Sequence, residues 1–159
     1  MVKSMITLNI GDIAPDFTMP VQVGIDIKLS ELKGKIVVLY FYPKDDTPGC
    51  TLEAQEFSLL KPEFDKFNTI IIGVSKDDIN SHHQFKNKYC LQFALASDTN
   101  SNTCEQYGAY VEKSLFGKKY KTVDRVTFLI DQDGKIRYIW PKVSARGHAK
   151  EVLNVIKKM

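Results

Sequence analysis

The residues best suited to chemistry lie in the short segment Thr47-Pro48-Gly49-Cys50. This segment follows an apolar run and precedes a helical pattern, so Cys50 is expected in the first turn of a helix. The free N–H groups and positive dipole end there stabilise a thiolate, and cysteines in such settings have pKa values of about 3.5–7.5 instead of about 8.5. Cys50 is therefore a candidate nucleophile. The alternative is a small cysteine that is merely packed, as in a non-catalytic binding or chaperone domain.

A thiolate in this segment needs a nearby cation, because Asp45 and Asp46 would oppose ionisation if they faced the sulfur. Lys44 is one candidate, and Arg125, which directly precedes the apolar run VTFLI, is another. Thr47 occupies the first position of a Cys-x-x-Cys spacing, so no local disulfide can form and a dithiol oxidoreductase is disfavoured. A lone thiolate beside a hydroxyl suits attack on an electrophile whose leaving oxygen accepts a hydrogen bond, and a peroxide is the simplest such substrate.

The elements that must position this segment follow from the hydrophobic pattern. Residues 36–42 (IVVLYFY) indicate a strand that is covered on both faces. Residues 51–67 have helical periodicity, with Pro62 expected to bend or restart the helix, and residues 70–74 indicate a second buried strand. The three elements form a βαβ unit, whose strands are parallel.

The middle of the chain continues the alternation of helices and strands. Asp77 or Asp78 can cap a helix that ends near Cys90, and a short strand is expected over residues 93–96. The polar stretch SDTNSNT can then cap, through its serine and asparagine residues, a helix that ends at about Tyr107.

The last third of the chain contains a loop, a hairpin and a closing helix. The lysine-rich residues 113–121 are expected to form a solvated loop. Residues 126–130 and 135–140 flank Asp133-Gly134, a strong signal for an antiparallel hairpin. Apolar residues at helical spacing after position 149 predict the final helix.

This order of elements predicts the α/β class and a thioredoxin-like fold, with a mixed central sheet flanked by helices. A chain of 159 residues is expected to form a single domain spanning residues 1–159. Met5 is a second candidate initiator, in which case residues 1–4 come from an added tag.

Composition excludes several classes of protein. Hydrophobic residues at 43% and charged residues at 26% are typical of globular domains, and no apolar run is long enough to span a membrane. A net charge of +3 is too small to predict nucleic-acid binding. The N-terminal region lacks the pattern of a secretory signal, and three scattered cysteines do not make a disulfide scaffold. A cytoplasmic protein with reduced thiols is expected.

The active-site segment also carries a family pattern. Pro43-x3-Thr47-x2-Cys50 matches the peroxiredoxin signature, and residues 42–57 (YPKDDTPGCTLEAQEF) resemble the bacterioferritin comigratory protein or peroxiredoxin Q branch of that family. Further blocks of resemblance follow the same order along the chain: GDIAPDF, then IIGVSKD and RVTFLID, and finally GHAKEVL. The resemblance therefore covers nearly the whole chain.

The resemblance implies a thiol peroxidase without a cofactor. By it, Cys50 is the peroxidatic cysteine, Thr47 and Arg125 donate hydrogen bonds, and Pro43 shields and shapes the pocket. Cys50 attacks hydrogen peroxide or an organic hydroperoxide and becomes a sulfenic acid, which a thiol must reduce. The implied partners are a hydroperoxide and a reductant such as thioredoxin, glutaredoxin or glutathione, and a monomer is expected. Glu53 either orients Arg125 or only favours the helix dipole.

One departure from the family pattern concerns recycling. Many members of the branch have a resolving cysteine five residues after the peroxidatic one, where this chain has Gln55. We therefore expect a one-cysteine mechanism in which an outside thiol attacks the sulfenate of Cys50. The alternative is a two-cysteine mechanism resolved by Cys90 or Cys104, with Cys90 favoured of the two, and it requires unwinding of the active-site helix to satisfy disulfide geometry.

The other metal-ligating side chains do not predict a metal site. His82, His83, Cys90, Cys104 and His148 lack the close pairs that zinc sites use, so no metal is expected. His82 and His83 are expected on a helix surface, and His148 is expected to cap or pack near the final helix.

Overall fold

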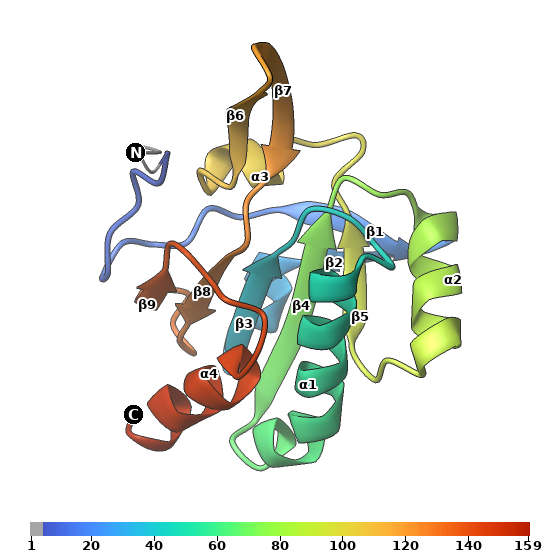
Figure 1. Ribbon diagram of the computed structural model, residues 1–159. Helices are drawn as coiled ribbons and strands as arrows, with labels where there is room; N and C mark the ends of the chain where they lie inside the picture. The colour runs from blue at the N-terminus through green and yellow to red at the C-terminus, as the bar shows by residue number, and fades with distance from the viewer. Residues whose placement is uncertain (1–4) are drawn as a thin grey trace.

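A computed structural model describes residues 5–159, and the suggested tag, residues 1–4, lies outside the described residues (Figure 1). Five strands form a mixed central sheet in the order β5-β4-β3-β8-β9. Their bounds are β3 Ile36–Phe41, β4 Thr69–Ser75, β5 Ala94–Ser97, β8 Val126–Ile130 and β9 Ile136–Trp140. Both the predicted fold class and the sheet with helices on its faces are confirmed.

Strand β3 lies at the centre of the sheet, parallel to β4 and antiparallel to β8. All six of its residues are buried, as its continuous apolar pattern predicts. Opposite Tyr40 in the register is Gly73, where a Cβ atom would lie only 2.8 Å from the Tyr40 ring. The glycine therefore makes room for a large aromatic side chain in the middle of the sheet.

Side chains of β3 alternate between two hydrophobic layers. Val38 and Tyr40 belong to the layer under helices α1 (Pro48–Asp65) and α4 (His148–Lys157), which pack against each other on one face (Figure 1). Val37, Leu39 and Phe41 belong to the opposite layer, beneath the N-terminal segment and the short helix α3. The active-site helix α1 is thus held by a core on its inner side.

The remaining elements surround this sheet. Helix α2 contacts β5, and a 3-10 turn follows the hairpin β1–β2. Their bounds are α2 Ile79–Tyr89, α3 Thr103–Gln106, β1 Thr18–Gln22, β2 Ile25–Lys28 and η1 Leu29–Leu32. The hairpin β1–β2 is not predicted from the sequence, because its residues are largely exposed and lack a continuous apolar face. Pro62 lies inside α1 without dividing it into two helices.

One sequence prediction of secondary structure is wrong. The lysine-rich residues 113–121 do not form a loop but lie in an antiparallel hairpin of β6 (Tyr110–Leu115) and β7 (Lys118–Val123). Most of the hairpin is exposed, so its two faces carry no apolar alternation that could reveal the strands. It projects away from the central sheet (Figure 1).

None of the helices formed by residues 5–159 combines the length and apolar character needed to cross a membrane.

Candidate active site

Cys50 lies in the first turn of α1, immediately beyond the carboxyl end of the most buried strand. Thr47 is the N-cap residue and Pro48 is the first helical residue, a position that tolerates proline because its N–H would have no helical partner. The side chain of Cys50 is buried. The predicted position of this thiol at a helix N-terminus is therefore confirmed.

Arg125 provides the cation next to Cys50. Its Nη2 atom donates to Cys50 Sγ across 3.4 Å, although 75 residues separate the two in sequence. Arg125 directly precedes β8, which pairs with β3, and this neighbourhood brings the guanidinium to the loop that leaves β3. At Gly49 a Cβ atom would lie 3.1 Å from Arg125 Nη2, so the glycine leaves space for the guanidinium.

Glu53 holds the other side of the same guanidinium. Its Oε1 atom accepts a hydrogen bond from Arg125 Nη1 across 2.7 Å, and three residues along a helix place Glu53 on the same face as Cys50. Of the two roles considered for Glu53, the structure shows the contact with Arg125. Burial raises the pKa of Glu53 to about 7, although Arg125 opposes this shift. Glu53 Oε2 is buried and has no hydrogen-bond partner among the described residues.

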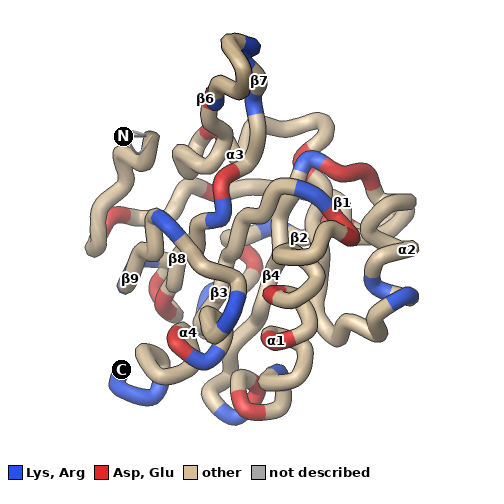
Figure 2. Tube along the Cα trace, in the orientation of Figure 1, with Lys and Arg blue, Asp and Glu red and all other residues tan. Residues whose placement is uncertain are grey.

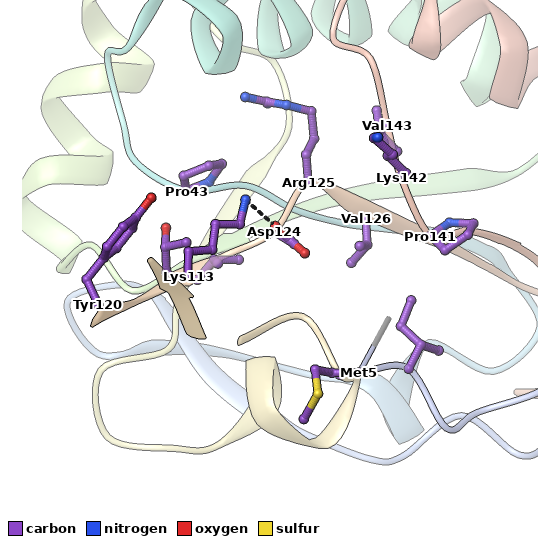
Figure 3. Close-up of a pocket in the computed structure, with 14 residues that line it drawn as sticks. Met5, Pro43, Lys113, Tyr120, Asp124, Arg125, Val126, Pro141, Lys142 and Val143 are labelled. Carbon is purple, nitrogen blue, oxygen red and sulfur yellow. Dashed lines mark ion pairs between the residues drawn. The ribbon is translucent and has the colours of Figure 1, made fainter. Parts of the chain in front are cut away.

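Thr47 and Pro43 lie on the loop between β3 and α1. The hydroxyl of Thr47 donates to the carbonyl oxygen of Lys44 across 2.9 Å, which closes the turn before the helix. Pro43 and Arg125 both line a pocket of about 850 Å³, which Val126 and the segment 141–143 also border (Figure 3).

The hairpin β6–β7 forms the opposite wall of this pocket. In Figure 3, Lys113 and Tyr120 lie on the side of the pocket opposite Pro141, and Lys113 Nζ forms an ion pair of 2.8 Å with Asp124. The pocket therefore lies beside the active site, between Pro43 and Arg125 and the hairpin, and its lining includes neither Cys50 nor Thr47.

The two acidic residues of the loop have partners of their own. Asp46 accepts hydrogen bonds from Lys88 Nζ at 2.7 Å and from Tyr89 Oη at 2.6 Å, both at the end of α2. Asp45 is buried and accepts from Tyr42 Oη at 2.5 Å. These contacts occupy both carboxylates, so neither acid depends on the region of Cys50 for a partner.

The prediction that His82 lies on a helix surface is wrong. The side chain is 1% exposed, with Nδ1 2.7 Å from Asp45 Oδ2 and Nε2 3.0 Å from the carbonyl oxygen of Ala96. His82 falls at the same helical spacing as Ile79 and Phe85, so the pattern did indicate a place on the inner face. What the sequence does not show is that Asp45 supplies a buried partner.

The other two histidines lie as predicted. His83 is exposed, and His148 is the first residue of α4 and is buried, with Nε2 2.8 Å from the hydroxyl of Thr127. Asp45, Asp77 and His82 are close enough together to hold a metal ion, but their polar atoms already bind neighbouring protein groups.

The two remaining cysteines differ in their surroundings. Cys104 is fully buried in α3, where Asp98 accepts a hydrogen bond from its N–H at 2.8 Å, and burial raises the pKa of its thiol. The N-cap residue of α3 is Asn102, one of the residues that the sequence offers for this position, but its side chain makes no capping hydrogen bond, and Asp98 instead accepts from the N–H groups of Thr103 and Cys104. Cys90 is exposed and ends α2 in a left-handed conformation. All three cysteines are free.

Comparison with known proteins decides the family. The profile of the AhpC/TSA family matches residues 10–139. The chain belongs to this family. A relative from Coxiella burnetii, named peroxiredoxin bcp, is 50% identical over 147 residues, which cover 92% of this chain and 97% of the relative. Peroxiredoxin Bcp of Bacillus subtilis is 42% identical over 153 residues, which cover 96% of this chain and 98% of the relative.

A solved structure of the same branch agrees with this assignment. The Xanthomonas campestris bacterioferritin comigratory protein has a TM-score of 0.88 and 35% identity, and the match covers 99% of this chain and 98% of that chain. The predicted resemblance to this branch is confirmed. As a member of the peroxiredoxins of the AhpC/TSA family, the protein is a thiol-dependent peroxidase, which acts on hydroperoxides and is re-reduced by a thiol.

Proposed function

We propose that Cys50 is the residue that reduces the hydroperoxide. Its thiolate sulfur attacks the distal oxygen, the O–O bond breaks, and the electron pair of that bond leaves with the other oxygen. That oxygen takes a proton and departs as water or an alcohol, while Cys50 becomes a sulfenic acid. The observation that carries this proposal is the hydrogen bond from Arg125 Nη2 to Cys50 Sγ, because it gives one buried thiol a fixed positive partner.

The proposed roles of the neighbours follow from their positions. Arg125 stabilises the thiolate and donates to the oxygen that develops negative charge. The backbone N–H of Cys50, in the first turn of α1, is a further donor, and the hydroxyl of Thr47 becomes one by turning away from the carbonyl oxygen of Lys44, to which it donates in the structure. Pro43 limits access of water from the pocket side. Substrates include organic hydroperoxides as well as hydrogen peroxide, supported by the alkyl peroxide reduction described for the Xanthomonas campestris relative.

An outside thiol completes the cycle in this proposal. It attacks the sulfur of the sulfenic acid, water leaves, and a second thiol then reduces the mixed disulfide. Gln55 stands exposed where many relatives have a resolving cysteine, and Cys104 is buried behind Asp98. Thioredoxin, glutaredoxin and glutathione are the candidate reductants. We further propose that the protein acts as a monomer in the cytoplasm, where its thiols stay reduced.

Two hydrogen bonds near Cys90 favour this cysteine as a second candidate for the recycling step. Lys88 and Tyr89, next to Cys90, bind Asp46 in the loop that leads to Cys50. Cys90 is also exposed, so a disulfide with Cys50 needs only Cys50 to be uncovered, by unwinding of the start of α1, whereas one with Cys104 needs two buried thiols to be uncovered. This route would make the protein a two-cysteine peroxidase.

The test is to treat the reduced protein with one equivalent of peroxide, block free thiols and map the cysteines by mass. A one-cysteine enzyme yields oxidised or externally conjugated Cys50 with Cys90 and Cys104 free, and Cys90→Ser then turns over at the wild-type rate with each reductant. A dominant disulfide between Cys50 and Cys90, with turnover lost in Cys90→Ser, would replace this route by the two-cysteine one.

The control variant for the first step is Cys50→Ser. It is expected to abolish peroxide reduction while circular dichroism shows an intact fold, since replacing one sulfur atom by oxygen costs at most a few kcal/mol. Substantial turnover in this folded variant would reject Cys50 as the nucleophile. Unreactive Cys50 in the wild type would instead favour a non-catalytic binding or chaperone domain.

A further inference from the structure

The tip of the hairpin β6–β7 has an unusual composition for a tight turn. Leu115 pairs with Lys118, so the loop consists of Phe116 and Gly117, with φ angles of 51° and 77°. Two positive φ angles in a two-residue loop are typical of a type I′ turn, which favours asparagine, aspartate or glycine. Here a phenylalanine occupies the first position, and its side chain is 97% exposed.

No contact among residues 5–159 accounts for a phenylalanine at this position. A bulky side chain in the left-handed region is strained, and such strain persists only where something else compensates for it. Phe116 contributes almost no buried surface, and Leu115 beside it is 57% exposed. Two large apolar side chains at the outermost point of a hairpin therefore indicate a contact that lies outside the protein.

The charge around this tip is strongly positive. Residues 113–121 contain four lysines and no acidic residue. Lys118 and Lys119 follow the turn directly and are exposed, and Figure 2 shows basic residues at the end of the hairpin. Lys113 is paired with Asp124 and Lys121 lies over the Tyr110 ring, both nearer the base, whereas Lys118 and Lys119 beside Phe116 form no ion pair with any residue that the structure describes. The surface thus combines a protruding apolar tip with flanking cations.

We propose that this tip, residues 115–119, docks on an anionic lipid surface. Leu115 and Phe116 enter the boundary between headgroups and acyl chains, while Lys118 and Lys119 bind the headgroup phosphates. Apolar side chains beside lysines are the pattern by which surface segments associate with anionic bilayers. Charge complementarity with phosphate selects an anionic surface over a neutral one.

The same strand face connects the tip to the pocket. Residues opposite each other in an antiparallel pair share a face, and every second pair lies on the same side. The pair of Lys113 and Tyr120 lines the pocket of Arg125, and the next pair on that face is Leu115 with Lys118. Leu115 and Lys118 of the tip therefore lie on the pocket side of the hairpin, whereas Lys119, which pairs with Ser114, lies on the other side, so docking through both lysines is end-on.

The test is flotation of the reduced full-length protein with vesicles of phosphatidylcholine containing phosphatidylglycerol, and with phosphatidylcholine alone. We expect binding to the anionic vesicles at low ionic strength and its loss as salt is added. Leu115→Ser combined with Phe116→Ser is expected to weaken binding at least about tenfold. The double variant Lys118→Glu with Lys119→Glu is expected to weaken vesicle binding by at least about fivefold for each lysine that is replaced.

Matched controls keep the test specific to the tip. Leu59→Ser removes another exposed apolar side chain, on α1, and Lys157→Glu with Lys158→Glu removes two exposed lysines from the C-terminal region. Both controls should bind vesicles like the wild type. Reduction of a small peroxide, which needs no membrane, should be unchanged in all four variants and shows that each one is folded.

Any of four results would overturn the proposal. The first is no binding to anionic vesicles at low salt, and the second is equal binding to neutral and anionic vesicles. The third is binding that the tip variants and the controls reduce alike. If the tip variants instead lose only turnover with a protein reductant, the tip is a protein-docking site and the lipid proposal is wrong. Since binding requires no reaction at Cys50, its failure leaves the proposed catalytic function untouched.

Discussion

The buried Glu53 and the partly exposed Arg125 form an ion pair with 2.7 Å between Oε1 and Nη1. Arg125 uses its other terminal nitrogen for Cys50, so the carboxyl group of Glu53 orients the guanidinium that binds the thiol. Burial raises the pKa of Glu53 from 4.5 to about 7, more strongly than Arg125 lowers it. The site therefore contains an acid that changes its charge near neutral pH.

This raised pKa predicts a specific pH dependence of stability. Below pH 4.5 Glu53 is protonated in both the folded and the unfolded chain. As the pH rises from 4.5 to about 7, the unfolded chain releases this proton first, so the free energy of unfolding falls. The expected loss from this residue is about 3 kcal/mol over the window, and it does not grow above it.

Glu53→Gln should remove this component, because the amide keeps a hydrogen bond to Arg125 but does not titrate. Urea unfolding at a series of pH values measures it, with Glu63→Gln, on the outer side of the same helix, as the control. The slope between pH 4.5 and 7 is expected to become flatter in Glu53→Gln and to persist in the control. An unchanged slope in Glu53→Gln would show that Glu53 is ionised throughout this range.

Replacement of Arg125 tests its role at the sulfur. Arg125→Ala is expected to slow sulfenate formation by about 10²–10³-fold, the cost of losing one preorganised donor. Arg125→Lys keeps the charge but cannot bridge Cys50 and Glu53 with two nitrogens, so an intermediate rate is expected. Stopped-flow kinetics with hydrogen peroxide measure both variants. If the rate is unchanged in Arg125→Ala, the contact is only structural.

Gly49→Ala separates helix stability from catalysis. Alanine normally stabilises a helix position by about 0.5–1 kcal/mol relative to glycine. Its Cβ atom here would lie 3.1 Å from Arg125 Nη2, so the guanidinium must shift by a few tenths of an ångström. We expect an equally or more stable protein that reduces peroxide more slowly, as measured by thermal unfolding and stopped-flow rates. A variant that is more stable and equally fast would show that Arg125 tolerates the displacement.

How well the sequence predicts this site differs from residue to residue. It depends on whether the elements that place the residue are adjacent in the chain. Cys50 was predictable because the strand, the turn and the helix that place it are adjacent in the chain. Arg125 was a candidate only because it precedes a buried strand, and pairing of that strand with β3 brings it to the thiol. Glu53 was left with two roles, since no local pattern shows which partner a buried acid meets.

The two wrong predictions, for residues 113–121 and for His82, concern features that no local pattern in the sequence reports. The sequence of the hairpin β6–β7 predicts a loop because strands exposed on both faces carry no apolar alternation. A surface position is predicted for His82 because a polar residue inside a helix is usually solvated, and its buried partner Asp45 lies 37 residues away. Such polar pairs depend on tertiary contacts that periodicity does not report.

Thiol labelling should distinguish the two cysteines outside the active-site helix. Cys90 is exposed, whereas Cys104 is buried and the pKa of its thiol is raised mainly by that burial. An uncharged alkylating reagent at neutral pH is expected to modify Cys90 in the folded protein, and to modify Cys104 only after denaturation. Mass mapping after timed quenching measures both. Equal labelling of the two cysteines in the folded protein would show that α3 opens readily.

Removal of His82 should destabilise the protein through Asp45. Asp45 is buried and binds His82 Nδ1 at 2.7 Å, so His82→Leu leaves a buried carboxylate without its main partner. Breaking a buried pair in this way costs about 3–5 kcal/mol, whereas His83→Leu, at the exposed neighbouring position, should stay within about 0.5 kcal/mol. Urea unfolding compares the two variants. Adding Asp45→Asn to His82→Leu should recover part of the loss, because the amide carries no charge to strand in the core. Equal and small effects of the two histidine variants would show that Tyr42 and Ser81 alone satisfy Asp45, and that His82 does not hold the loop before Cys50 in place.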